Sequence, residues 1–238
     1  MKTSDPKVVA LRAKVDAAQQ ELDMAIAFHE VWKPAAYDTD LHARMGVSYA
    51  TQTFNITRTA LRREMVLALA RLWDRRPEAV GMQAIAANVG NKSVMDVLVA
   101  ERSANMGIPG AADQVREEMD KKAKAVLALV VKYDRGGSHA AGLKKLITLR
   151  NERLAHRQTV PVAVTGDNVD DAEIEAFYQD NLRLINILLS LVKGQAYDPE
   201  DTAGIFRHYA GHFWAAARGE QTEGHPNYRG RPGQLPAG

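Results

Sequence analysis

The sequence contains no cysteine, which excludes disulfide bonds and metal sites built from thiolates. Long apolar runs are also missing. The most apolar tract, residues 184–192, is interrupted by Asn186 and Ser190 and is too short to span a bilayer. The first residues contain no apolar segment typical of a secretory signal peptide. We therefore expect a cytoplasmic protein with no membrane anchor.

The charge of the whole chain is close to balanced. The net charge is only +2, so the total does not force binding to a polyanion, and the distribution of charge matters more. Hydrophobic residues make up 46% of the 238 residues, which is enough for a substantial core. We expect one helical domain over residues 1–219. Residues 220–238, with three prolines and several glycines, should form a flexible tail.

Apolar residues recur every three or four positions along most of the chain, which is the period of an amphipathic α-helix. This pattern predicts an all-α fold, an up-and-down bundle of about six to seven helices. The predicted helices cover residues 7–32, 48–73, 94–105, 111–133, 139–158, 170–193 and 202–218, with a short helix or turn over 82–89.

Several local features set the expected helix boundaries. The first helix should end at Lys33–Pro34, because the residue before a proline avoids the α region, and residues 35–46 then form a connector. Ser93 is expected to cap the helix that begins at 94. His29 ends the apolar stripe of the first helix, and we interpret it as a core histidine. Residues 160–168 look extended, but no nearby segment obviously pairs with them.

The stretch from Leu143 to Arg157 carries the strongest chemical pattern. Arg150 falls seven positions after Leu143 and four before Leu154, so it lies on the apolar stripe of this helix. A buried arginine is costly unless it is paired or directed into a solvated cleft. His156 lies about 120° around a straight helix from Arg150. One helix therefore does not stack the two side chains, but a groove or a symmetric partner helix could bring them together.

Basic residues are concentrated in two places. Residues 143–158 hold five lysines and arginines against Glu152, a local excess of +4 before His156 is protonated. Such a surface binds phosphates, and its binding weakens with salt. Residues 58–76 hold six arginines against two acids. That run is either a solvated helix face or a phosphate-binding wall. Within it, Arg71 and Asp74 could also pair with each other.

Arg150-Asn151, four further residues and His156 resemble the signature of the HEPN-domain ribonucleases. The form Leu-Arg-Asn-Glu-Arg-Leu-Ala-His is most similar to the HEPN subgroup associated with bacterial abortive infection. The arginine-rich helix within 58–76 also resembles the second conserved helix of that group. The resemblance implies a homodimer whose two signature helices face one cleft. It also implies a toxin or phage-defence effector, with an antitoxin or another regulatory protein as a further partner.

The chemistry implied by this resemblance needs no metal and no cofactor. RNA supplies its own nucleophile, the 2′-hydroxyl, and His156 would act as general acid and base. Arg150 would stabilise the negative charge of the transition state, and Asn151 would orient the phosphate or the imidazole. The products would be a 2′,3′-cyclic phosphate and a 5′-hydroxyl. The expected RNA-binding residues are Lys144, Lys145, Arg153, Arg157 and Arg58.

The same residues also fit a non-catalytic helical module that binds a nucleotide or a protein. Glu152 and His156 are four residues apart and could form a simple surface pair. Arg150 could pair with an acid on a neighbouring helix. His208 and His212 have a spacing that two metal ligands use, but no carboxylate completes a His-Glu-x-x-His pattern. We therefore expect no metal site.

Overall fold

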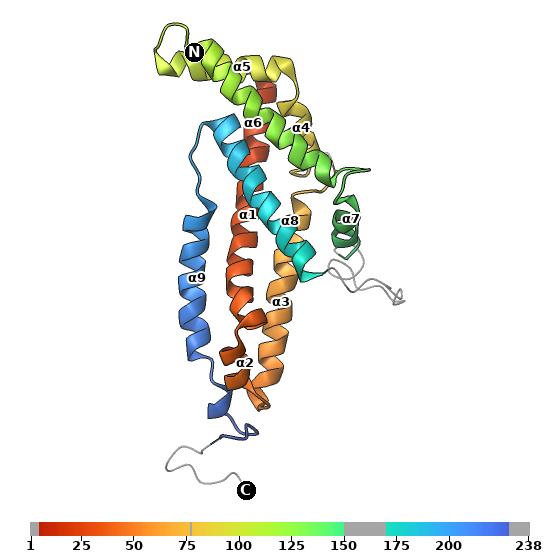
Figure 1. Cartoon of the computed structure of the whole chain (residues 1–238), viewed down its shortest axis with the longest axis vertical. Helices are drawn as coiled ribbons and strands as arrows, with labels where there is room; N and C mark the ends of the chain where they lie inside the picture. The colour runs from red at the N-terminus through yellow and green to blue at the C-terminus, as the bar shows by residue number, and fades with distance from the viewer. Residues whose placement is uncertain (1–4, 77, 150–169, 229–238) are drawn as a thin grey trace. The chain divides into compact units, whose positions relative to one another are not determined.

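The computed structural model describes residues 5–76, 78–149 and 170–228 (Figure 1). Within these ranges there are nine α-helices and no strand, which confirms the all-α class. The contacts divide the chain into two compact units. The first unit comprises residues 1–24 and 66–199, and the second comprises 25–65 and 200–238. The expectation of one domain over residues 1–219 stays a prediction.

The helices of the first unit alternate with short turns rich in glycine. Gly107 and Gly110, between two of these helices, have φ angles of 63° and 79°, in the left-handed region that favours glycine. The predicted ranges 82–89 and 111–133 are confirmed. The helices of the described residues in both units are α1 Pro6–Tyr37, α2 Thr39–Met45, α3 Tyr49–Arg71, α4 Met82–Val89, α5 Lys92–Met106, α6 Ala111–Tyr133, α7 Ala140–Leu149, α8 Asp171–Leu188 and α9 Pro199–Ala216, with a π-helical turn at Leu189–Lys193 and a 3₁₀ turn at Gly219–Gln221.

The expected end of the first helix at Lys33–Pro34 is wrong. Helix α1 contains Pro34 and continues to Tyr37. A proline inside a helix disturbs the hydrogen bonding of the preceding turn. Here the carbonyl of Val31 accepts a hydrogen bond from the indole nitrogen of Trp214 at 2.8 Å, and Ala35 is fully buried. A tertiary hydrogen bond and burial therefore support the turn that the proline disturbs.

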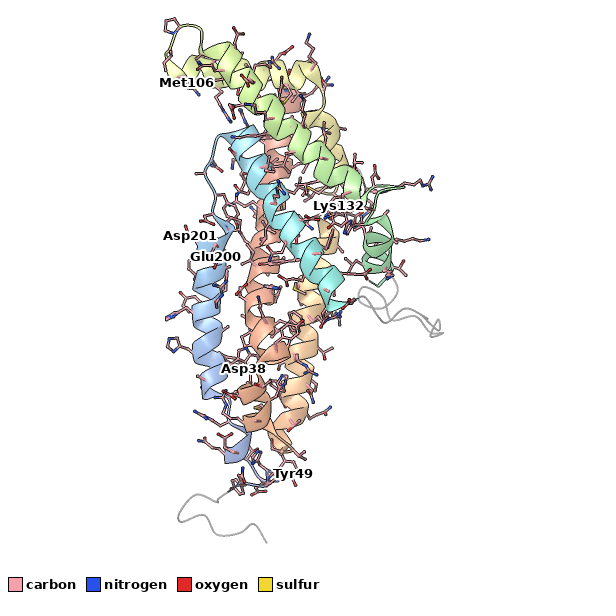
Figure 2. The ribbon with its side chains drawn as sticks, viewed as in Figure 1. Asp38, Tyr49, Met106, Lys132, Glu200 and Asp201 are labelled. Atoms are coloured by element: carbon pink, nitrogen blue, oxygen red, sulfur yellow. The ribbon has the colours of Figure 1, made fainter. Side chains whose placement is uncertain are left out.

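The predicted connector over residues 35–46 is also wrong, because most of it is helical. Asp38, labelled in Figure 2, caps helix α2 by accepting a hydrogen bond from the backbone nitrogen of Leu41 at 3.0 Å. Leu41 and Met45 are buried. The cap and the two apolar residues at i and i+4 account for this short helix.

The cap of helix α5 is Asn91 and not Ser93. The side-chain oxygen of Asn91 accepts hydrogen bonds from the backbone nitrogens of Ser93 and Val94, at 2.9 and 3.4 Å. The hydroxyl of Ser93 donates to the same oxygen at 2.7 Å. The helix therefore begins two residues earlier than expected, at Lys92, and Ser93 supports the cap.

An aromatic cluster lies in the core of the first unit, where the end of α3 meets α6 and α8. Trp73, Tyr133 and Phe177 are buried. Their ring centroids are 5.2 Å apart for Trp73 and Tyr133, 5.9 Å for Trp73 and Phe177, and 5.0 Å for Tyr133 and Phe177. Tilted and edge-on contacts at these distances are favourable arrangements for aromatic rings. The cluster fixes the end of α6 against α8.

The second unit has a core of its own. Its buried residues come from the end of α1, from α2, from the first part of α3 and from α9 (Figure 1). Phe54 and Trp214 meet edge to face, with ring centroids 5.6 Å apart. Part of the predicted tail belongs to this unit, since His225 is buried. The remainder of the tail, residues 229–238, lies outside the described residues.

None of the described helices is long and apolar enough to cross a membrane. The predicted extended segment 160–168 lies outside the described residues. His29 is buried, and its Nδ1 lies 3.0 Å from the carboxylate of Glu30, so its interpretation as a core histidine is confirmed.

Candidate functional site

Helix α7 leads in sequence directly to the HEPN-like signature. Its buried face contains Leu143 and Leu146, and its exposed face contains Lys144 and Lys145. The ammonium of Lys145 lies 3.3 Å from the carboxylate of Glu173 on α8. The catalytic residues predicted from the sequence and two of the predicted RNA contacts, Arg150, Asn151, His156, Arg153 and Arg157, lie outside the described residues.

The end of helix α6 is fixed to α8 by a partly buried polar cluster. Lys132, labelled in Figure 2, and Tyr133 both donate hydrogen bonds to one carboxylate oxygen of Asp180. The hydroxyl of Tyr133 is 2.5 Å from that oxygen. Burial and the bond to Asp180 raise the pKa of Tyr133 far above its ordinary value. Tyr133 therefore remains a protonated donor and does not act as a base.

A pocket of about 370 Å³ lies beside this cluster. Its wall is formed by the end of α6, the turn between Tyr133 and Ala140, helix α7 and the beginning of α8. The floor is aromatic and aliphatic, and the rim is polar. The apolar lining consists of Tyr133, Phe177, Leu143, Leu146 and small residues of α7 and α8, and the polar lining consists of Ser138, His139, Asp170 and Glu173.

His139 is a polar residue of this pocket that the sequence analysis did not identify. Its Nδ1 lies 2.8 Å from the hydroxyl of Ser138, and its ring centroid lies 5.5 Å from that of Tyr133. The residue is exposed at the rim. The sequence holds only a weak signal for it, a histidine just before a helix, because the α8 residues that complete the pocket are remote in the chain.

Four arginines of the 58–76 run are paired with acids. Arg63 lies 3.8 Å from Glu64. Arg71 donates to Glu21 at 2.8 Å, so the alternative pairing of Arg71 with Asp74 is wrong. Arg75 donates to Asp134 at 3.0 Å, and Arg76 donates to Asp74 at 2.7 Å. These pairs engage four of the six arginines, which favours a solvated, salt-bridged face over a phosphate-binding wall.

Arg58, a predicted RNA contact, belongs to the second unit. Its guanidinium carbon lies 6.0 Å from the ring centroid of Phe54, one turn earlier on α3. A cation at this distance from an aromatic face makes a weak favourable contact. The side chain is half-buried. Arg58 therefore has a packing role in the second unit, while its contact with RNA stays a prediction.

His208 and His212 lie on the exposed surface of α9, with ring centroids 4.6 Å apart. No group of three or more histidines, cysteines or acids that could hold a metal ion occurs in the part of the chain that the structure describes. Two imidazoles without a third ligand are a weak basis for a zinc site. The two imidazoles contact each other edge to face on this surface.

Comparison with known proteins supplies the family. No curated protein and no solved structure matches the chain. A family model described as AbiU2, a HEPN family, matches residues 9–213. The matched region contains helix α7, the pocket beside it and the Arg150–His156 pattern. This chain therefore belongs to the HEPN_AbiU2 family.

Proposed function

We propose that this protein is a metal-independent endoribonuclease of HEPN type, a toxin or phage-defence effector that works in the cytoplasm. The observation that carries the proposal is the family match, which includes Arg150, Asn151 and His156 in their characteristic spacing. An arginine, a polar residue and a histidine supply the groups needed for cleavage through the 2′-hydroxyl.

The roles of the three residues follow from the chemistry of RNA. His156 takes the proton of the 2′-hydroxyl or protonates the leaving 5′-oxygen. Arg150 stabilises the charge that develops on the phosphate oxygens, and Asn151 orients the phosphate or the imidazole. The 2′-oxygen forms a new bond to phosphorus while the bond to the 5′-oxygen breaks. The products are a 2′,3′-cyclic phosphate and a 5′-hydroxyl.

The described part of helix α7 supports an RNA partner through its charge. Lys144 and Lys145 are exposed on the turn that precedes the signature in the chain. With Arg153 and Arg157 they would form a basic surface for the phosphates on either side of the cleaved bond. We further propose a homodimer that brings two signature helices to one cleft, and an antitoxin or another regulatory protein that restrains the activity.

The experiment that tests the reaction is incubation of the purified protein with mixed RNAs in EDTA. We expect cleavage that persists in the chelator and products with cyclic phosphate ends. His156→Ala and Arg150→Ala should abolish it. Matched controls are His212→Ala and Arg183→Ala, since both residues are exposed on other helices. These controls should cleave like the wild type.

Other results would contradict the proposed ribonuclease function or its mechanism. Loss of all cleavage in EDTA, with recovery on adding a divalent metal, would exclude the metal-independent mechanism. A folded protein that cleaves no RNA under either condition would favour the non-catalytic module that binds a nucleotide or a protein. Sedimentation of the same samples gives the oligomeric state, and a monomer that cleaves RNA would exclude the composite two-fold site.

A further inference from the structure

The pocket between α7 and α8 has features of a site for one flat, polar ring. Its volume of about 370 Å³ lies at the lower end of the range found for small-ligand pockets. Small side chains line part of it, namely Ala141, Gly142, Ala172 and Ala176. These residues leave room between the two helices for a planar group. A nucleobase fits such a space better than a bulky or branched side chain does.

Aromatic rings provide surfaces on which a base can stack. Tyr133 and Phe177 lie at the floor, with ring centroids 5.0 Å apart, and His139 lies at the rim against Tyr133. Proteins recognise unpaired RNA bases by stacking them on aromatic or histidine rings. The hydrogen bond from Tyr133 to Asp180 holds the floor ring in place. Tyr133 and Phe177 are only 3% and 2% exposed, so their rings close the bottom of the pocket, and the exposed ring of His139 is the surface on which a base can stack.

The rim determines which bases fit. Asp170 and Glu173 place carboxylates there, and carboxylates only accept hydrogen bonds when they are ionised. Adenine, cytosine and guanine carry exocyclic amino groups that donate hydrogen bonds. Uracil presents carbonyl oxygens at the corresponding positions, and these repel a carboxylate. The hydroxyl of Ser138 can donate to an acceptor on the same base edge.

We propose that this pocket binds one nucleobase of the RNA substrate and selects a base that carries an exocyclic amino group. The inference rests on the proposed ribonuclease function, because α7 leads in the chain to Arg150. It adds a specificity site to that function. The selecting groups are the carboxylates of Asp170 and Glu173, and the stacking group is the ring of His139 above the buried rings of Tyr133 and Phe177.

The test uses short 2′-O-methyl oligonucleotides with a single unmodified ribose, so that only one bond can be cleaved. The base on each side of that bond is varied in turn. For one of the two positions, the wild type should cleave at cytosine about tenfold faster than at uracil, the size expected for one good polar contact to a base edge. Cytosine and uracil share the ring size, so this comparison isolates the amino group.

Two variants test the pocket itself. Ala176→Leu fills it, and its matched control is Ala128→Leu on the exposed face of α6. The double variant Asp170→Asn with Glu173→Gln removes the rim charge while Asn keeps the helix cap. Its matched control is Glu175→Gln, on the same helix and outside the pocket lining. Both pocket variants should bring the ratio of cytosine to uracil cleavage toward one, and both controls should keep it.

Binding of cytidine and uridine monophosphate, measured by calorimetry on the same proteins, separates this proposal from the ribonuclease function. If the protein cleaves no RNA but binds cytidine monophosphate more tightly than uridine monophosphate, the ribonuclease function is wrong and the base-binding pocket stands. In that case Ala176→Leu should lose the binding of cytidine monophosphate. If the wild type is active and both folded pocket variants keep its ratio of cytosine to uracil cleavage, this pocket does not select the base. If Ala176→Leu fails to fold, the surface double variant still decides the question.

Discussion

The indole nitrogen of Trp73 donates a hydrogen bond of 2.9 Å to the side-chain oxygen of Asn181, and both residues are buried in the first unit. Asn181 in turn donates to the carbonyl of Phe177 at 2.7 Å. The amide thus joins the end of α3 to α8 at the aromatic cluster. A buried polar side chain that is fully engaged in this way fixes the register of two helices.

Replacing Asn181 by leucine should lower the free energy of unfolding by about 1 to 3 kcal/mol, because the buried indole nitrogen loses its acceptor. Denaturant unfolding followed by tryptophan fluorescence measures the loss. Asn105→Leu is the matched control, since Asn105 is exposed on α5, and it should change stability by less than about 0.5 kcal/mol. Equal stability of the two variants would contradict the structural role of this bond.

The pair of the buried Glu30 and the exposed Arg207 should make the second unit sensitive to acid. Burial by itself raises the pKa of Glu30. The hydrogen bonds and charges of His29 and Arg207 lower it by more, so the pKa of Glu30 falls below its ordinary value of 4.5. A carboxyl with a lowered folded-state pKa stabilises the fold above its unfolded pKa. That stability is lost as the pH falls through the folded pKa.

The measurement is urea unfolding at several pH values on either side of 4.5, with Glu30→Gln as the variant. Wild-type stability should fall as the pH decreases, and the variant should show a shallower fall, because its residue 30 has no proton to bind. Glu223→Gln, an exposed glutamate in the same unit, is the control. A variant that keeps the full pH dependence would show that other groups control it.

The contact between Tyr133 and Asp180 separates a structural role from a role in base recognition. Tyr133→Phe removes the hydroxyl that donates to Asp180 but keeps the ring at the pocket floor. We expect a loss of about 1 kcal/mol in the free energy of unfolding. The base preference should be unchanged, since the buried ring still closes the bottom of the pocket. A changed base preference with unchanged stability would instead show that the hydroxyl takes part in base recognition and does not stabilise the fold.

Lys144 should contribute to RNA affinity through phosphate contacts, if the protein binds RNA as proposed. Its side chain is exposed on α7, while Lys145 lies near Glu173. Lys144→Gln should reduce the slope of log affinity against log salt by about 0.7, the value for one phosphate contact on a single strand. Lys121→Gln is the control, because Lys121 pairs with Glu117 and Glu118 on α6. An unchanged slope for Lys144→Gln would place the RNA elsewhere.

The sequence by itself predicted most of the secondary structure and the family. The ranges of α4 and α6 follow from apolar periodicity bounded by glycines, and both determinants are local in the chain. The start of α8 near residue 170 is also a local signal, because the side chain of Asp170 accepts from the nitrogen of Ala172 at 3.2 Å. The HEPN resemblance was carried by residues within eight positions of each other, which is why the chain alone showed it.

Only the tertiary structure decided the partners of remote residues. Helix α1 continues past Pro34 where Trp214, 183 residues after Val31, donates to the Val31 carbonyl. The pocket, with His139 at its rim, exists because α8 packs against the end of α6. Periodicity fixes which face of a helix is apolar, but not which distant helix covers that face. That choice depends on the packing of the whole unit, and hydrogen bonds over long separations follow from it.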